Sequence, residues 1–104
     1  MQTEEAIEIA KKNDAFRKSG FGVVVTPGVQ VLEDLGGLID EIRQFNEFTE
    51  DNDPYGEHDF GTVYWFGAKV FWKVDYYDQT LKYGRHPLDL DCRRVMTVML
   101  ASEY

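Results

Sequence analysis

The residues best suited to chemistry are three consecutive polar side chains, Glu57, His58 and Asp59. A histidine titrates near neutral pH, and a neighbouring carboxylate can orient it as a general base or join it at a metal ion. In a strand, however, Glu57 and Asp59 point to one face and His58 to the other, so the three do not converge. Gly56 and Gly61 permit unusual backbone angles, which leaves open a small hydrolase-like or metal-assisted enzyme centred on these residues.

The other candidates for metal binding or nucleophilic chemistry are His86 and Cys92. A zinc site would have to combine both histidines with carboxylates, because Cys92 has no second cysteine at ligand spacing. Arg93 and Arg94 would favour a thiolate at Cys92, but a lone cysteine at the start of an apolar segment is typical of packing. We therefore expect no metal and no cofactor. We also expect no catalytic residue, except in the alternative of an enzyme centred on His58.

The densest charge feature is a run of six carboxylates in thirteen residues without an intervening lysine or arginine. Its members are Glu47, Glu50, Asp51, Asp53, Glu57 and Asp59. One interpretation is a solvated face. The other is a partner-binding surface, because carboxylates three or four residues apart on a helix lie about 5–6 Å from each other, a spacing similar to that of successive nucleic-acid phosphates. Such a nucleic-acid mimic would occupy a basic surface of a protein.

The composition of the whole chain fits one acidic, folded domain spanning residues 1–104. Hydrophobic residues make up 43% of the 104 residues, which is too many for intrinsic disorder, and the formal net charge is −8. That charge disfavours direct binding to nucleic acid or anionic membranes and favours a basic protein or protein complex as partner. A single cysteine, no secretory leader and no apolar stretch of about 18 residues predict a cytoplasmic protein.

The N-terminal elements that frame these residues are a helix and a strand. Residues 3–18 predict an amphipathic helix, with Thr3 as its N-cap and Gly20 as its stop. Residues 21–26 contain three consecutive valines and predict a strand. The strand must end before Pro27, which is also a favourable first residue for a short helical turn.

The middle of the chain predicts a helix followed by a hairpin. After two glycines, apolar spacing indicates a helix over residues 38–49, then a type I turn over residues 53–56. Residues 60–66 and 69–77 are aromatic and β-branched and predict two hairpin strands. Strand alternation assigns one face of the second strand to the core. The residues on that face are Val70, Trp72, Val74 and Tyr76.

The C-terminal part leaves two structures open. Residues 78–90 indicate an irregular connection, after which Asp91 favours a helix over residues 92–104. The run from Val95 to Leu100 is apolar nearly all round, so a central strand is the alternative. The expected fold class is therefore α+β, with an N-terminal helix, an antiparallel sheet containing the aromatic hairpin, and a C-terminal helix.

Three stretches carry a resemblance: they read NDPYGEHDFG at 52–61, KVDYYD at 73–78 and MLASEY at 99–104. Together with NDAFR at 13–17, they resemble a family of short bacterial proteins classed as a domain of unknown function and often found on plasmids and prophages. The resemblance implies no activity and no site residue. What it implies is context, because small acidic proteins of mobile elements include inhibitors of host defence, such as anti-CRISPR and anti-restriction proteins.

These observations favour a non-enzymatic protein that binds a basic partner, with the enzyme centred on His58 as the alternative. A third hypothesis is a structural subunit that works as a homodimer or larger oligomer. It depends on whether Trp65 or Phe71 lies on an outer face, because exposed aromatic side chains supply large contact areas at protein interfaces.

Overall fold

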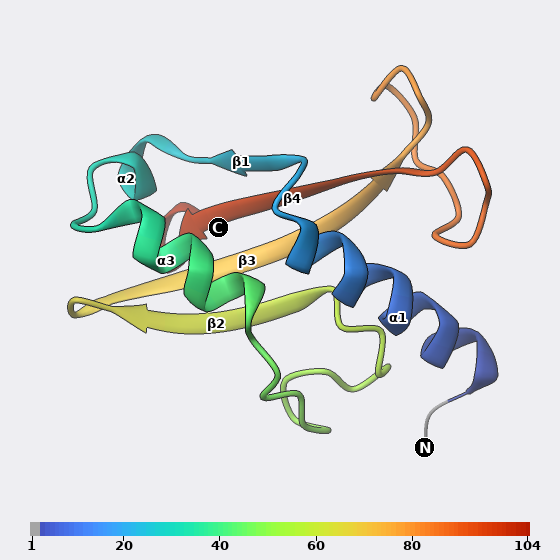
Figure 1. Cartoon of the computed structure of the whole chain (residues 1–104), viewed down its shortest axis with the longest axis horizontal. Coiled ribbons are helices and arrows are strands. Elements are labelled where there is room, and N and C mark those ends of the chain that lie inside the picture. The colour runs from blue at the N-terminus through green and yellow to red at the C-terminus, as the bar shows by residue number, and fades with distance from the viewer. Residues whose placement is uncertain (1–2) are drawn as a thin grey trace.

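Two helices lie over one face of a four-stranded sheet in the computed structural model, which describes residues 3–104 (Figure 1). The elements in chain order are α1 (Glu4–Ser19), β1 (Val23–Val25), α2 (Pro27–Gln30), α3 (Leu35–Arg43), β2 (Phe60–Trp65), β3 (Ala68–Tyr77), β4 (Arg93–Leu100) and the 3₁₀ helix η1 (Ala101–Glu103). The expected α+β class is confirmed. Within residues 3–104, no helix has the length and apolarity needed to cross a membrane.

The sheet is mixed, and the expectation of a purely antiparallel sheet is wrong. Its strand order is β1-β4-β3-β2, with β1 parallel to β4 and the other pairs antiparallel. A parallel pair requires a long crossover between its strands. The segment from α2 to the end of the 78–92 connection supplies that crossover. Because they stand at the two ends of the strand order, β1 and β2 are the edge strands.

The expected C-terminal helix is also wrong, because Arg93–Leu100 forms the central strand β4. Val95, Thr97 and Val98 are β-branched and suit a pleated sheet better than a helix. Met96 and Val98 are fully buried on the helix side, while on the other face Met99 is 8% exposed and Val95 and Thr97 are half-buried. Apolar residues therefore occur on both faces of β4, which is why the run is apolar nearly all round, as in the strand alternative.

Local patterns predicted α1 and the hairpin correctly. The Thr3 hydroxyl accepts a hydrogen bond from the Ala6 N–H (3.0 Å), and Gly20 ends α1 in a left-handed conformation. Strands β2 and β3 are joined through Phe66 and Gly67, whose φ angles of 47° and 83° fit a tight two-residue hairpin turn.

The core lies between the sheet and the helices. On β3, Trp72 and Val74 are 0% and 2% exposed, as predicted, while the alternate residues Lys73 and Asp75 are half-exposed. Gly61 lies opposite Trp72 on β2, where a Cβ atom would collide with the indole ring. The large side chain of Trp72 therefore fits because its neighbour has none.

Helix α3 is shorter than the predicted helix over residues 38–49. It begins one residue after Asp34, whose carboxylate accepts a hydrogen bond from the Gly37 N–H (3.1 Å), so the two glycines lie in its first turn. It ends at Arg43. Residues 44–59 form a loop instead, and this loop carries the acidic run.

Candidate functional site

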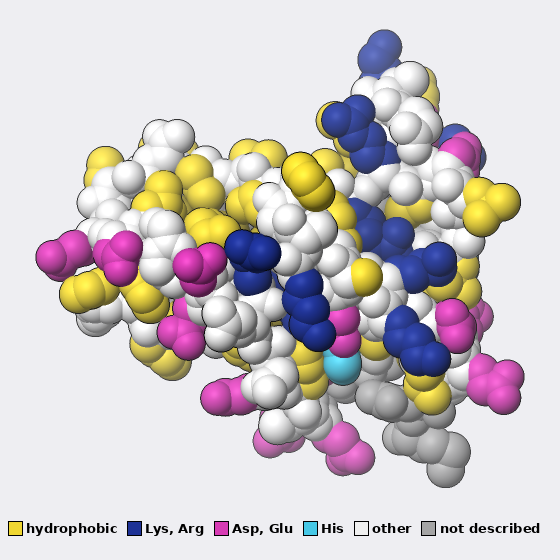
Figure 2. Space-filling view, viewed as in Figure 1, with side chains coloured by type: hydrophobic (Ala, Val, Ile, Leu, Met, Phe, Trp, Pro, Cys, Tyr) yellow, Lys and Arg dark blue, Asp and Glu magenta, His cyan; other side chains and the backbone are white. Residues whose placement is uncertain are grey.

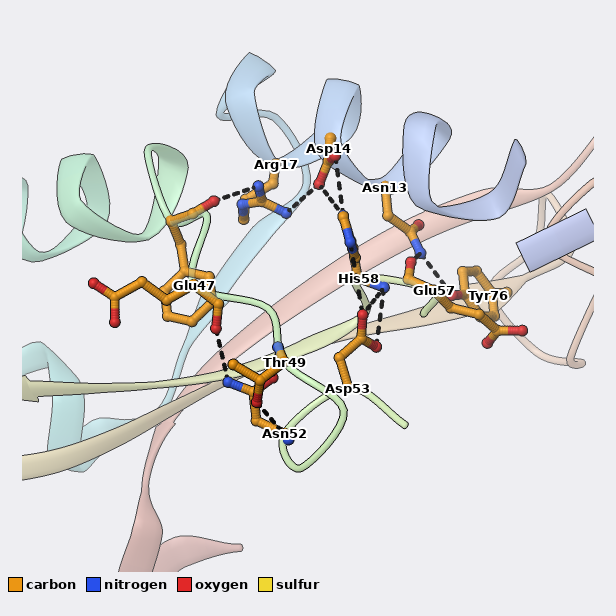
Figure 3. Close-up of polar contacts among 11 residues, drawn as sticks. Asn13, Asp14, Arg17, Glu47, Thr49, Asn52, Asp53, Glu57, His58 and Tyr76 are labelled. Atoms are coloured by element: carbon orange, nitrogen blue, oxygen red, sulfur yellow. Dashed lines mark hydrogen bonds and ion pairs between the residues drawn. The ribbon is translucent and has the colours of Figure 1, made fainter. Parts of the chain in front are cut away.

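The loop of residues 44–59 is held in shape by its own hydrogen bonds (Figure 3). The Asn52 side chain donates to the Glu47 carbonyl (2.8 Å) and accepts from the Thr49 N–H (2.8 Å). The Asp53 N–H donates to the Thr49 carbonyl (2.8 Å), and the Gly56 N–H donates to the Asp53 carbonyl (3.0 Å), which closes the predicted turn. These bonds fix the backbone from which the acidic side chains project.

Phe48 anchors the same loop to the core. Its ring stacks on the His58 ring, with 3.8 Å between centroids and 4° between planes. It also meets Phe45 and Trp72 edge-on, at 5.0 Å and 6.1 Å. The loop is therefore packed at Phe48 as well as hydrogen-bonded internally.

His58 lies between two carboxylates from different parts of the chain (Figure 3). Its Nδ1 is 3.0 Å from Oδ1 of Asp14 on α1, and its Nε2 is 3.6 Å from Oδ2 of Asp53. The backbone N–H of His58 also donates to both carboxylate oxygens of Asp53, at 3.3 Å each, and His58 has a φ of 57°. A general base must present a nitrogen to its substrate, whereas here both ring nitrogens face carboxylates.

The structure does not bring Glu57 and Asp59 to the His58 ring. The Glu57 carbonyl accepts a hydrogen bond from Asn13 (2.9 Å), and the Asp59 carboxylate lies 3.5 Å from the Tyr76 hydroxyl. Burial raises the pKa of both carboxyl groups; for Glu57 the charges of Asp59 and Asp53 add to this increase. Burial is also the main cause of the raised pKa of Tyr76.

Two buried polar residues of α1, Asn13 and Arg17, tie the helix to the loop and the sheet. Asn13 is 0% exposed; its amide group donates to the Tyr76 hydroxyl (2.9 Å), and its Oδ1 accepts from Nε of Arg94 (2.7 Å). Arg17 is 1% exposed and donates to Asp14 (3.1 Å) and to a backbone carbonyl of the loop, at Phe45 (2.8 Å).

The sequence analysis included Asn13 and Arg17 in the amphipathic helix over residues 3–18 without assigning either a role. The available signal was their spacing, because Asn13 and Arg17 continue the row of Ile9 and Ala10 that faces the core. A polar residue on such a stripe has to find hydrogen-bond partners when it is buried.

The other candidates for chemistry, His86 and Cys92, contact residues other than those around His58. Nε2 of His86 is 2.9 Å from Oε1 of Glu5 on the exposed surface, and Cys92 is half-buried with its sulfur 3.8 Å from Arg94. Across the described part of the chain, no three His, Cys, Asp or Glu side chains are arranged to hold a metal ion.

The six carboxylates of the acidic run do not share one face. Glu47, Glu50 and Asp51 are exposed, whereas Asp53 is 8% exposed and points toward His58. Glu57 and Asp59 are half-buried. Figure 2 shows acidic side chains along the lower edge of the molecule, where the loop lies in Figure 1. We call Glu47, Glu50 and Asp51 the acidic loop face.

Two hollows border this loop. A groove of about 290 Å³ runs between the end of α3 and strand β2; it is lined by Glu41, Gln44, Phe45, Asn46, Glu47, Thr62, Val63 and Tyr64. A second hollow, of about 260 Å³, lies beside His58; it is lined by Phe48, Thr49, Glu50, Asp53, Pro54, Gly56 and His58. Each hollow is lined by one carboxylate of the acidic loop face, Glu47 in the groove and Glu50 in the second hollow.

Comparisons with known proteins add a family but no activity. No match was found among curated proteins, and none among solved structures. A family model described as "Protein of unknown function (DUF3768)" matches residues 25–103, which include the loop and strands β2, β3 and β4 but not α1. The chain therefore belongs to the DUF3768 family of proteins of unknown function.

Proposed function

We propose that this protein is a non-enzymatic, cytoplasmic binding protein whose acidic loop face engages a basic surface on a macromolecular partner. The observation that carries the proposal is the combination of exposed charge with a fixed backbone. Glu47, Glu50 and Asp51 are exposed, while the loop beneath them is hydrogen-bonded through Asn52 and packed through Phe48. A preorganised loop loses less conformational entropy when it binds, so more of the interaction energy appears as affinity.

The charge of the molecule supports the same conclusion. The formal net charge is −8, and no lysine or arginine occurs between Glu47 and Asp59. Complementary charge accelerates the encounter of two proteins and suppresses wrong partners. Asp53 contributes differently from its neighbours, because its buried carboxylate holds the His58 backbone inside the loop.

The partner that fits this face is a protein that presents clustered lysine or arginine side chains, such as the groove of a nucleic-acid-binding protein. The helix spacing expected for these carboxylates does not apply, since α3 ends at Arg43 and the loop sets their positions. In the context of mobile elements suggested by the sequence resemblance, the specific form of the proposal is an inhibitor of a nucleic-acid-guided or nucleic-acid-cutting defence complex.

The test is affinity capture from a lysate of the native host with three proteins: the parent, a loop variant and a matched control. The loop variant is Glu47→Gln, Glu50→Gln and Asp51→Asn. The control is Glu8→Gln, Glu33→Gln and Asp89→Asn, three exposed carboxylates outside the loop. Each set removes three negative charges, so the formal net charge changes from −8 to −5 in both.

The proposal predicts that mass spectrometry identifies a basic protein captured by the parent and the control but lost with the loop variant. Amide substitutions at exposed sites leave the fold intact, because removing repulsion among like charges costs little stability. Equal capture by all three proteins, with unchanged melting temperatures, would exclude the acidic loop face as the binding surface.

A further inference from the structure

We infer that the outer edge of β2 binds an extended basic segment of the partner as an added β-strand. This inference rests on the proposed function and names the form that the partner takes at the groove beside the acidic loop face. The first observation that supports the added strand is the position and length of β2. It is an edge strand of six residues, whereas the other edge strand, β1, has only three. Six residues are about the usual length of a strand in a sheet.

Three residues of β2 direct their backbone groups away from the sheet. In a two-residue hairpin the flanking residues, here Trp65 and Ala68, exchange hydrogen bonds, and bonded and non-bonded pairs then alternate along the strands. The bond from the Val74 N–H to the Asp59 carbonyl (2.8 Å) continues the same alternation. The residues with outward N–H and C=O groups are Phe60, Thr62 and Tyr64. Within residues 3–104, Thr62 and Tyr64 have no backbone hydrogen-bond partner outside the sheet.

The groove beside this edge gives the added strand a place and a charge. Thr62 and Tyr64 form one wall, and the other wall, from the end of α3 and the loop, carries the carboxylates of Glu41 and Glu47. Among the described residues that line the groove there is no lysine, arginine or histidine. The free backbone groups therefore face a negatively charged channel, which favours a cationic segment over a neutral or acidic one.

The geometry of the sheet predicts the pattern of that segment. Alternate residues of a strand point to opposite faces, so every second residue of the added strand would point to the helix side, near Glu41 and Glu47. These positions suit lysine or arginine. The intervening residues would lie beside Thr62 and Tyr64 on the other face, where the Tyr64 side chain is 71% exposed. These positions suit apolar or β-branched side chains.

A second copy of this chain is a poor occupant of the same edge. Pairing β2 of one copy with β2 of another would bring together two chains of charge −8. It would also place two copies of Glu41 and of Glu47 beside the same interface. Charged side chains beside an edge strand are a common device against self-association. The same charges that oppose a second copy attract a basic strand.

The test uses synthetic peptides of about six residues, the usual strand length, and fluorescence anisotropy. The first peptide alternates lysine with valine. The second has the same composition with all lysines consecutive, and the third is the first peptide N-methylated at alternate residues so that one edge cannot pair. The alternating peptide should bind at least about tenfold more tightly than either of the other two. Hydrogen exchange at the Thr62 and Tyr64 amides should slow when it binds.

The matched protein variants are Thr62→Pro and Thr62→Ala. Proline removes one outward N–H and is tolerated on an edge strand, whereas alanine keeps that N–H and removes only the side chain. We expect Thr62→Pro to weaken binding of the alternating peptide by about tenfold and Thr62→Ala to change it by less than about twofold. If Thr62→Pro does not fold, amide exchange in the parent protein and the N-methylated peptide decide the question.

The outcomes separate this inference from the proposed function. Equal binding of all three peptides, with no protection at Thr62 and Tyr64, would overturn the added strand. If the loop variant then still loses its captured partner, the acidic loop face stands without it. Retained capture by that variant would overturn the proposed function even if the alternating peptide binds at β2.

Discussion

At the scale of single residues, the polar contacts around α1 show what a sequence can and cannot reveal. The burial of Asn13 follows from its place on the helix stripe, but its partners Glu57, Tyr76 and Arg94 lie 44, 63 and 81 residues away. The same limit applies to His58, whose ring contacts Asp14 rather than its sequence neighbours. Local periodicity indicates that a residue is buried, whereas its hydrogen-bond partners depend on the tertiary fold.

Replacing Arg17 should destabilise the protein strongly. Arg17→Met keeps an apolar stem against Trp72 but leaves the Phe45 carbonyl and the Asp14 carboxylate without this donor. We expect a loss of about 2–3 kcal/mol in the free energy of unfolding, measured by urea denaturation. The neighbouring exposed substitution Lys18→Met should change it by less than about 0.5 kcal/mol. Similar values for the two variants would show that the buried network contributes little.

Asp59 should make stability depend on pH with a predictable sign. Burial raises the pKa of Asp59 above its ordinary value of 3.8, so the folded state holds the proton more tightly than the unfolded state. This contribution lowers stability at neutral pH, and the penalty is relieved as pH falls through the folded pKa toward 3.8.

Asp59→Asn removes this charge and keeps an oxygen that can accept from Tyr76. The gain in unfolding free energy over the parent should be largest at neutral pH and should shrink as pH approaches 3.8, which thermal unfolding across that range can measure. A difference that stays constant with pH would mean that the Asp59 carboxylate is not desolvated in the folded state.

At the scale of elements, strong local patterns predicted α1 and the β2–β3 hairpin, and weaker ones failed. The helix predicted over residues 38–49 included Phe45 and Phe48 because of their apolar spacing, yet both rings anchor a loop to the core. Strand β4 could not be distinguished from a buried helix, because Val95 and Met99 on its outer face are apolar like Met96 and Val98 on its inner face, which removes the alternation that identifies most strands. Only the pairing with β1 and β3 settles its structure.

The contact between β2 and β3 at Gly61 and Trp72 offers a specific test of core packing. Gly61→Ala would place a Cβ against the indole, near Nε1, Cε2 and Cζ2 of Trp72. We expect it to destabilise the protein by about 1–3 kcal/mol. Trp72→Phe removes the indole nitrogen, so in the double variant the penalty for alanine should fall by more than about 0.5 kcal/mol. Additive effects in this double-mutant cycle would show that the two residues do not meet.

At the scale of the whole molecule, composition and structure carry different parts of the proposal. The net charge of −8 favours a basic partner, which remains a prediction, and the acidic run marks residues 47–59 as the candidate surface. The sequence could not show that Asp53 turns inward while Glu47, Glu50 and Asp51 remain exposed. That division depends on the bonds of His58 and Asn52 within the loop.

The most direct test of the acidic loop face is the salt dependence of the association rate with the captured partner. Surface-exposed charges act over the Debye length, about 10 Å at 0.1 M salt, so the parent should associate more slowly as salt rises through this range. The loop variant Glu47→Gln, Glu50→Gln and Asp51→Asn should associate slowly at low salt and show a much smaller salt slope. The control Glu8→Gln, Glu33→Gln and Asp89→Asn, with the same net charge, should keep most of the parent's rate and slope. Equal slopes for the loop variant and the control would contradict the proposal, because net charge alone would then account for the attraction.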